Sequence, residues 1–180
     1  DQCFYGGTRT NTGDDLNNNS ILEDSEVLQS SYDCSAAAGS NFVRIASFPV
    51  CQQLDINCNT DEETVAEIVV ASTDGMTLIY TDSPQNKAGF VNISDPANPQ
   101  AGGTVDLNGE PTSVAVKDGY ALVAVNTSAD YVNVSGELAV INIATQTVES
   151  IIPLGGQPDS IAVSPDGLYA AIAIENERDE

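Results

Sequence analysis

The chain has 180 residues, of which 41% are hydrophobic, so it is long enough to bury the core of one ordinary domain. Its 27 acidic residues against 5 basic ones give a formal net charge of −22, which excludes an electrostatic hold on nucleic acid or anionic lipid and favours cations such as Ca²⁺. Histidine is absent, which removes the commonest general base and zinc ligand and excludes Ser-His-Asp and Cys-His catalysis within this chain. The alternative is that the acidic surface only keeps an extracellular protein soluble.

Residues 1–63 are predicted to form an irregular extension that contains disulfides. Residues 1–41 are rich in Gly, Asn, Asp and Ser and are interpreted as loop, with one short helical piece over 21–28. One strand is expected near residues 42–50, followed by a polar loop to residue 63.

All four cysteines lie in this extension, and their even number predicts two disulfides in an oxidising compartment. We expect the pairs Cys3–Cys34 and Cys51–Cys58, although four cysteines allow three pairings. Zinc is the competing interpretation, but only one pair is close in sequence and no CxxC occurs. No haem or nucleotide is expected.

The chain begins at Asp1 without a charged-then-apolar leader, which is typical of a mature secreted protein. No stretch approaches the roughly 20 apolar residues of a membrane span. Four N-x-S/T triplets fit an extracellular glycoprotein if the source is eukaryotic, and they begin at Asn18, Asn92, Asn126 and Asn133.

Residues 64–180 contain an internal repeat. Asp-Gly pairs at residues 74–75, 118–119 and 166–167 each lie between apolar runs, which is a hairpin signal because Gly accepts a positive φ. Two further strands follow each of the first two hairpins, and Gly-x-Pro entries at residues 109–111 and 156–158 begin the next units. Four short strands in about 40–50 residues are the period of one β-propeller blade.

The predicted fold is therefore all-β, a partial β-propeller of four-stranded antiparallel blades behind the disulfide-stapled extension. The blades are expected over residues 66–108 and 109–155, with an incomplete blade over 156–180. A sandwich with accidental turn spacing is the alternative. A propeller typically closes with four to eight blades, so the expected partners are the remaining blades of the same polypeptide or another copy of the protein, together with glycans.

Residues 156–167, with the sequence GQPDSIAVSPDG, resemble a YVTN-type β-propeller repeat. Their continuation, LYAAIAIENERDE at residues 168–180, resembles the choice-of-anchor I group of secreted propellers. Some members of that group are labelled alkaline-phosphatase-like, and similar modules occur in mesenchyme-specific cell-surface glycoproteins. The resemblance covers residues 64–180 and is specific for fold rather than for function.

The loops after the second strand of each blade are expected to share one face of the disc. The repeat register places Asp82, Asn126 and Glu175 or Asn176 at equivalent positions there. Hard oxygen ligands on one face could hold Ca²⁺, and the candidate metal ligands are Asp82, Glu175, Asn176, Glu177 and Asp179. The alternative is that they are solvated loop residues, and Asn126 also begins a glycosylation triplet. Asp74, Asp118 and Asp166 are interpreted as turn residues rather than ligands.

No catalytic constellation is visible, so the sequence favours a secreted or cell-surface structural or binding glycoprotein module, self-assembling through strand pairing. The alternative is an enzyme, a calcium-dependent phosphatase or phytase-like hydrolase that uses a metal-activated water. It depends on the family labels and on the carboxylates of the shared face, and fold-level analogy is a weak warrant for activity.

Overall fold

A computed structural model describes residues 7–34 and 44–176 of the chain. The chain divides into two compact units, Asp1–Arg44 and Ile45–Glu180. The second unit includes residues 45–63, which the sequence analysis grouped with the extension. No helix among the described residues is long and apolar enough to cross a membrane.

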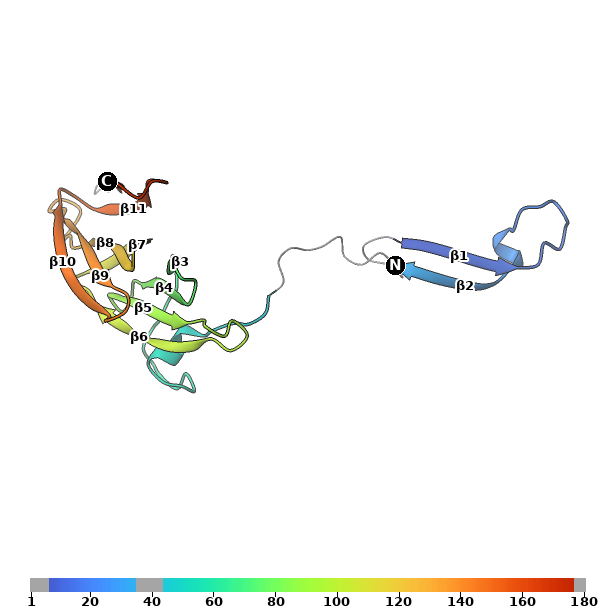
Figure 1. Cartoon of the computed structure of the whole chain (residues 1–180), viewed down its shortest axis with the longest axis horizontal. Coiled ribbons are helices and arrows are strands. Elements are labelled where there is room, and N and C mark those ends of the chain that lie inside the picture. The colour runs from blue at the N-terminus through green and yellow to red at the C-terminus, as the bar shows by residue number, and fades with distance from the viewer. Residues whose placement is uncertain (1–6, 35–43, 177–180) are drawn as a thin grey trace. The chain divides into compact units, whose positions relative to one another are not determined.

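The first unit contains an antiparallel hairpin of β1 (Gly7–Gly13) and β2 (Val27–Cys34), with the short 3-10 helix η1 (Asp24–Glu26) leading into β2 (Figure 1). The prediction of an irregular segment is therefore wrong for these residues. Alternating threonines at residues 8, 10 and 12 supply the β-branched side chains that favour a strand. The expected helical piece is confirmed only as the three residues of η1.

The second unit consists of antiparallel sheets that follow one another in the chain. The first sheet has the order β3-β4-β5-β6 and the second β7-β8-β9-β10, and β11 with β12 forms a two-stranded sheet. The strands of the first sheet are Val69–Ala71, Thr77–Asp82, Lys87–Asn92 and Gln100–Asp106. Those of the second sheet are Glu110–Lys117, Tyr120–Asn126, Gly136–Asn142 and Thr147–Leu154. Strands β11 and β12 are Pro158–Val163 and Ala170–Ile174.

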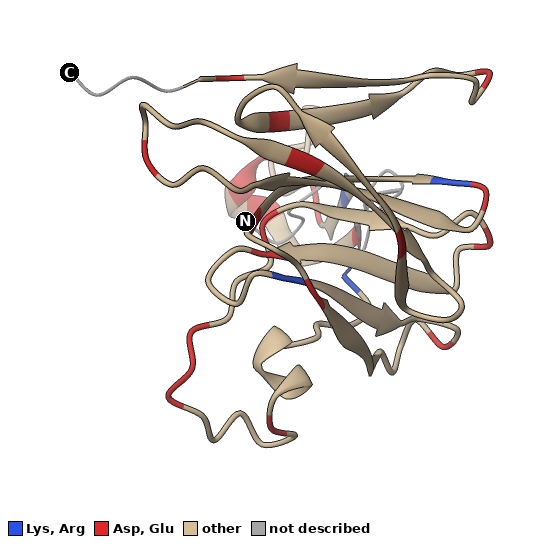
Figure 2. Cartoon of the chain, turned by 90° about the vertical axis from the view of Figure 1, so that its left-hand side faces the viewer, with Lys and Arg blue, Asp and Glu red and all other residues tan. Residues whose placement is uncertain are grey.

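This arrangement confirms the all-β fold and the four-stranded antiparallel sheets that the repeat predicted. The buried core joins the first and second sheets, and its fully buried members include Ile79, Phe90, Val123 and Ile141. These side chains alternate along their strands with residues of the opposite face, as a sheet packed on one side by its neighbour requires. Figure 2 shows the acidic residues mainly in turns and near strand ends of these sheets.

The strand expected near residues 42–50 is wrong for the described residues. Residues 44–49 have no regular secondary structure, and Val50–Gln53 form a 3-10 helix, η2. The segment instead lies against the face of the first sheet that points away from the core, where Ile45, Phe48 and Leu78 line a shared apolar cavity. Phe48 and Val50 are thus partly covered by a sheet face rather than paired in a ladder, while Ile45 stays 62% exposed.

Cys51 and Cys58 form a disulfide with a Cα–Cα distance of 5.1 Å, which confirms one predicted pair. The loop that it closes holds Gln53 over the first sheet, where its side chain donates to the carbonyl of Phe90 and accepts the N–H of Gly103. The other predicted pair, Cys3–Cys34, lies outside the residues whose side chains the structure describes.

Candidate functional site

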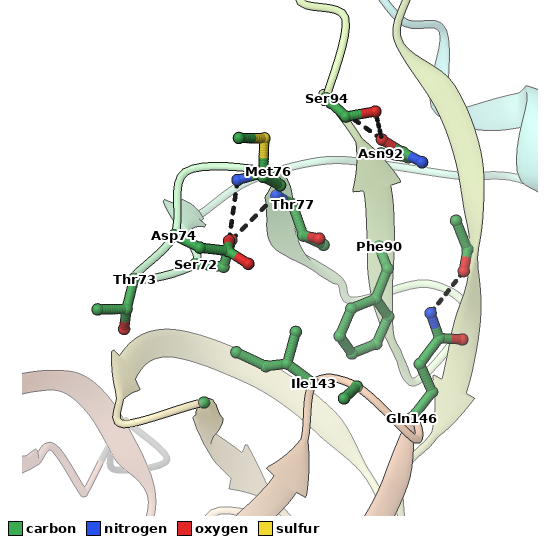
Figure 3. A pocket seen from close by; sticks show the side chains of 13 residues that line it. Ser72, Thr73, Asp74, Met76, Thr77, Phe90, Asn92, Ser94, Ile143 and Gln146 are labelled. Carbon is green, nitrogen blue, oxygen red and sulfur yellow. Dashed lines mark hydrogen bonds between the residues drawn. The ribbon is translucent and has the colours of Figure 1, made fainter.

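A cavity of about 580 Å³ lies between the first and second sheets, at the edge where the β3–β4, β7–β8 and β9–β10 turns meet (Figure 3). The buried ring of Phe90 and the side chain of Ile143 contribute apolar surface to it. Hydroxyl and amide groups also line it, from Ser72, Thr73, Thr77, Asn92, Ser94 and Gln146.

The β3–β4 turn positions one wall of this cavity through a side-chain network. The Asp74 carboxylate accepts the Ser72 hydroxyl at 2.6 Å and the Met76 N–H at 3.0 Å, while the Ser72 hydroxyl accepts the Thr77 N–H. The Ser72 hydroxyl, and next the Met76 N–H, hold the pKa of Asp74 below its ordinary value. Asp74 is therefore a turn residue, as the sequence predicted.

The opposite wall is tied to the first sheet by Gln146. Its amide nitrogen donates to the carbonyl of Gly102 at 2.6 Å, so a residue of the β9–β10 turn bridges the two sheets. On the first sheet, Asn92 Oδ1 accepts the N–H of Ser94 at 2.9 Å and its hydroxyl at 2.7 Å. The lining contains one carboxylate, Asp74, and no Lys or Arg, which suits a neutral polar ligand better than an anion.

This cavity was not among the sites predicted from the sequence. The available signal was the repeat register, which places the Asp-Gly turns of successive sheets at one edge. The register does not show that Gln146 reaches across to Gly102, because that contact joins residues 44 positions apart.

At the opposite edge, the structure brings together only part of the predicted metal site. Asn126, which ends β8, and Glu175, which follows β12, line one polar cavity of about 320 Å³, and Glu110 and Asp159 also line it. Asn176 uses its side-chain oxygen to accept the N–H of Gln157 at 3.0 Å. Glu177 and Asp179 lie outside the described residues.

Asp82 occupies the equivalent position of the first sheet, but it is 3% exposed and is absent from that cavity lining. Its carboxylate accepts the N–H of Val65 at 3.1 Å. Burial raises the pKa of Asp82, and the backbone hydrogen bonds and Lys87 act in the opposite direction. Within residues 7–34 and 44–176, no three His, Cys, Asp or Glu residues gather as a metal-binding group. This edge of the sheets, where Asp82, Asn126 and Glu175 lie, is called the rim below. The calcium site predicted there stays a prediction.

Tyr80 is a buried polar residue that sequence reasoning missed. Its hydroxyl is the buried side-chain atom that has no hydrogen-bond partner among the described residues. Burial, reinforced by the charge of Asp82, raises the pKa of Tyr80 to about 12, and the Gln53 amide, which lies near the hydroxyl without hydrogen-bonding geometry, acts in the opposite direction. The alternation of apolar residues along the strand is compatible with a Tyr at this position, but it does not show which residues cover the side chain.

The candidate glycosylation residues differ in accessibility. Asn18, Asn92 and Asn133 are exposed, whereas Asn126 is half-buried and its side-chain oxygen accepts the N–H of Ser128 at 3.0 Å. Glycosylation at all four residues stays a prediction.

Comparison with known proteins shows two matching family models. One, described as the choice-of-anchor I domain, matches residues 67–180. The other, a domain of unknown function (DUF7151), matches residues 1–34. No curated protein matches the sequence.

Two solved structures are similar to part of the chain. Hydrazine synthase of Kuenenia stuttgartiensis is 23% identical over 64% of this chain and 32% of its own, with a TM-score of 0.48. A functionally unknown protein from Desulfotomaculum acetoxidans DSM 771 is 15% identical over 59% of this chain and 32% of its own, with a TM-score of 0.47. The match spans about a third of the length of each.

Proposed function

Since the chain belongs to the choice-of-anchor I domain family, we propose that it is an extracellular structural or binding module, built of propeller blades, that assembles through strand pairing. The family description indicates a surface or secreted protein. The family match does not extend to the YVTN-type and alkaline-phosphatase-like proteins that the sequence also resembled.

The observation that carries the proposal is the open edge of the third sheet. Strand β11 repeats the position of β3 and β7, and β12 repeats that of β4 and β8. Strands β5 and β9 cover the free edges of β4 and β8, whereas no strand of the described residues lies beside β12. A row of unpaired backbone groups on such an edge is a template for another strand, from the remaining blades of the same polypeptide or from another copy of the protein.

The backbone of β12 defines which groups face outward. The N–H of Ser164 donates to the carbonyl of Tyr169, so these two residues form a hydrogen-bonded antiparallel pair. Because such pairs alternate along the ladder, the N–H groups of Ala170 and Ile172 point to the open edge. Side chains beside this edge are also exposed, including Leu168 and Tyr169 at 73% each.

Ala170→Pro tests strand addition, because proline removes an outward N–H without removing a bond to β11. The matched control is Ala170→Val, which retains the N–H and has a high strand propensity. In sedimentation velocity of the whole 180-residue chain, we expect concentration-dependent association of the wild type and of the Val variant, and loss of association in the Pro variant.

A wild-type chain that stays monomeric at every concentration would contradict self-assembly. Association of the Pro variant equal to that of the wild type would contradict the choice of β12 as the pairing edge. Circular dichroism of the Pro variant checks that its sheets are retained. The alternative function, a calcium-dependent hydrolase, requires the predicted rim ligands to hold the ion, and the Asp82→Asn variant described below tests that requirement.

A further inference from the structure

The loop that joins β1 to η1 carries a ligand pattern that neither matching family description assigns. Calcium loops of twelve residues place side-chain oxygens at positions 1, 3, 5 and 12, a backbone carbonyl at position 7, and a carboxylate that often acts through water at position 9. Residues 15–26 read DLNNNSILEDSE. Every one of those side-chain positions holds a residue of the required type, namely Asp15, Asn17, Asn19, Glu23 and Glu26.

We propose that residues 15–26 form a Ca²⁺-binding loop at the tip of the β1–β2 hairpin (Figure 1). The spacing of these residues, rather than the number of acidic ones, indicates the site. The neighbouring acidic residues Asp14 and Asp24 fall before position 1 and at position 10, where the pattern requires no ligand. This inference concerns the first unit and is independent of the proposed function of the sheets.

Position 6 of the pattern is the one departure, because this chain has Ser20 where such loops have Gly. The glycine is needed for a sharp turn with a positive φ. Ser20 has a φ of 64°, so the backbone makes this turn despite its side chain. The conformation that the motif requires is therefore present.

The first half of the loop wraps around Asp15. Its carboxylate accepts the N–H of Asn19 at 3.2 Å and that of Ser20 at 2.7 Å. Asn19 Oδ1 in turn accepts the N–H of Ile21 at 2.8 Å. In these bonds the backbone N–H groups of the loop donate to its own polar side chains. They place Asp15 and Asn19, at positions 1 and 5, within the same turn of the loop.

The second half of the loop brings Glu26, the position of the bidentate ligand, back to the start. Its two carboxylate oxygens accept the N–H of Leu16 at 3.0 Å and that of Glu23 at 3.2 Å. Gly13 makes this approach possible, since any larger residue there would overlap the backbone carbonyl of Glu26. The residue that closes a calcium loop thus lies beside the residue that opens it.

Burial of Glu26 is an independent indication that a cation belongs here. The residue is only 6% exposed, and neither ion pair of the described residues includes it. Its two backbone N–H donors partly offset the loss of water, and a bound cation would add the opposite charge that the carboxylate lacks. In this strongly acidic chain, Ca²⁺ is the cation whose oxygen ligands and spacing match.

Hydrogen bonds join the ligand positions 3, 5 and 9, although the carboxylates of the loop, whose residues are all described, do not gather as a metal-binding group in this structure. The side-chain amides of Asn19 and Asn17 donate to the two oxygens of Glu23, at 2.6 Å and 3.0 Å. Rotation of each amide by a half-turn would present its oxygen to an ion in the loop, in exchange for the backbone N–H that this oxygen now accepts.

Calcium titration of the intact 180-residue chain, followed by calorimetry and by backbone amide NMR, tests the proposal. With three carboxylates and two amides at the ligand positions, we expect one site in the roughly 10⁻⁴–10⁻³ M range of extracellular modules. The amide signals of residues 15–26 should shift on saturation. Signals of the β7–β10 sheet should not.

Two matched pairs of variants localise the ion. Glu26→Gln removes the bidentate ligand and should weaken binding at least about tenfold, whereas Asp24→Asn removes an equal charge at a non-ligand position and should leave binding nearly unchanged. Asn17→Asp adds a ligand charge and should tighten binding, whereas Asn18→Asp adds the same charge at position 4 and should not. The second pair keeps the test decisive if Glu26→Gln unfolds the hairpin.

Absence of saturable binding would overturn the proposal. So would equal losses in the Glu26 and Asp24 variants, or equal gains in the Asn17 and Asn18 variants, because either result would mean diffuse attraction to an acidic surface. Loss of the single site in Asp82→Asn or Glu175→Gln would assign the ion to the rim of the sheets instead.

Discussion

Asp74 and Asp166 show how one local sequence pattern makes the same turn twice. In each, a Ser-x-Asp-Gly segment lets the carboxylate accept the serine hydroxyl at 2.6 Å and the N–H two residues on. These bonds, with the serine hydroxyl the larger cause, lower the pKa of both carboxyls. Because the folded-state pKa is lowered, their contribution to stability is present above the unfolded value of about 3.9 and is lost as the pH falls through the folded value.

Asp82 behaves in the opposite sense, since burial raises its pKa. A carboxyl with a raised folded-state pKa favours folding most when it is protonated, and stability falls as the pH rises through that pKa. We expect Asp82→Asn to raise the melting temperature at neutral pH, because the amide retains an oxygen for the Val65 N–H and carries no charge. The difference from wild type should vanish in acid.

Thermal unfolding of both proteins across pH measures this effect, with Asp106→Asn as a surface control in which the carboxylate paired with Lys87 is exposed. A lower melting temperature of the Asp82 variant at neutral pH would contradict the account of burial. Calcium titration of the same variant tests the predicted role of Asp82 as a ligand at the rim. An unchanged calcium affinity would contradict that role.

At the scale of the element, the first sheet depends on a close fit between two of its strands. Gly89 of β5 pairs with Tyr80 of β4, and a Cβ atom at Gly89 would overlap the Tyr80 ring. The ring thus lies over a position where only glycine leaves room. The apolar segment that begins at Ile45 and the helix η2 lie on this same face of the sheet.

Gly89→Ala should destabilise the second unit by about 1–3 kcal/mol, the usual range for overpacking a filled interior. Tyr80→Phe should leave the stability unchanged or raise it, since the hydroxyl that it removes is buried without a partner. Chemical denaturation measures both changes. Equal stability of the Gly89 variant and the wild type would show that the ring can move aside, and a large loss in the Phe variant would reveal a hydrogen bond to the hydroxyl.

For the whole molecule, the net charge of −22 opposes both compaction and association. Screening shortens the Debye length from about 30 Å at 0.01 M salt to about 3 Å at 1 M. We therefore expect sodium chloride to raise the melting temperature and to strengthen association at β12. Calcium chloride at equal ionic strength should stabilise the first unit further, and Glu26→Gln should remove that additional effect.

Melting curves at matched ionic strength check this prediction, with Asp24→Asn as the control for charge. A melting temperature independent of sodium chloride would contradict the importance of self-repulsion. Identical effects of the two salts on wild type and on the Glu26 variant would contradict specific calcium binding.

The sequence alone was sufficient for the period of the sheets and for their turns. The Asp-Gly pairs and the alternation of apolar residues act between near neighbours, so they mark hairpins such as β7–β8 before any tertiary contact is known. The Cys51–Cys58 pair could be predicted for the same reason, because only seven positions separate its members. The ligand spacing of residues 15–26 is also local, but their low hydrophobicity led to an interpretation as loop with one short helical piece over residues 21–28.

Only the tertiary structure decided which distant groups meet. It placed Gln146 against Gly102, buried Asp82 within the first sheet, and laid the segment at residues 44–50 over a sheet face where the sequence predicted a strand. It also paired β1 with β2, two polar strands that bury almost nothing, and so brought Asp15 and Glu26 to the two ends of one loop. Such contacts depend on packing between separate elements, and the pattern within any one segment does not contain that information.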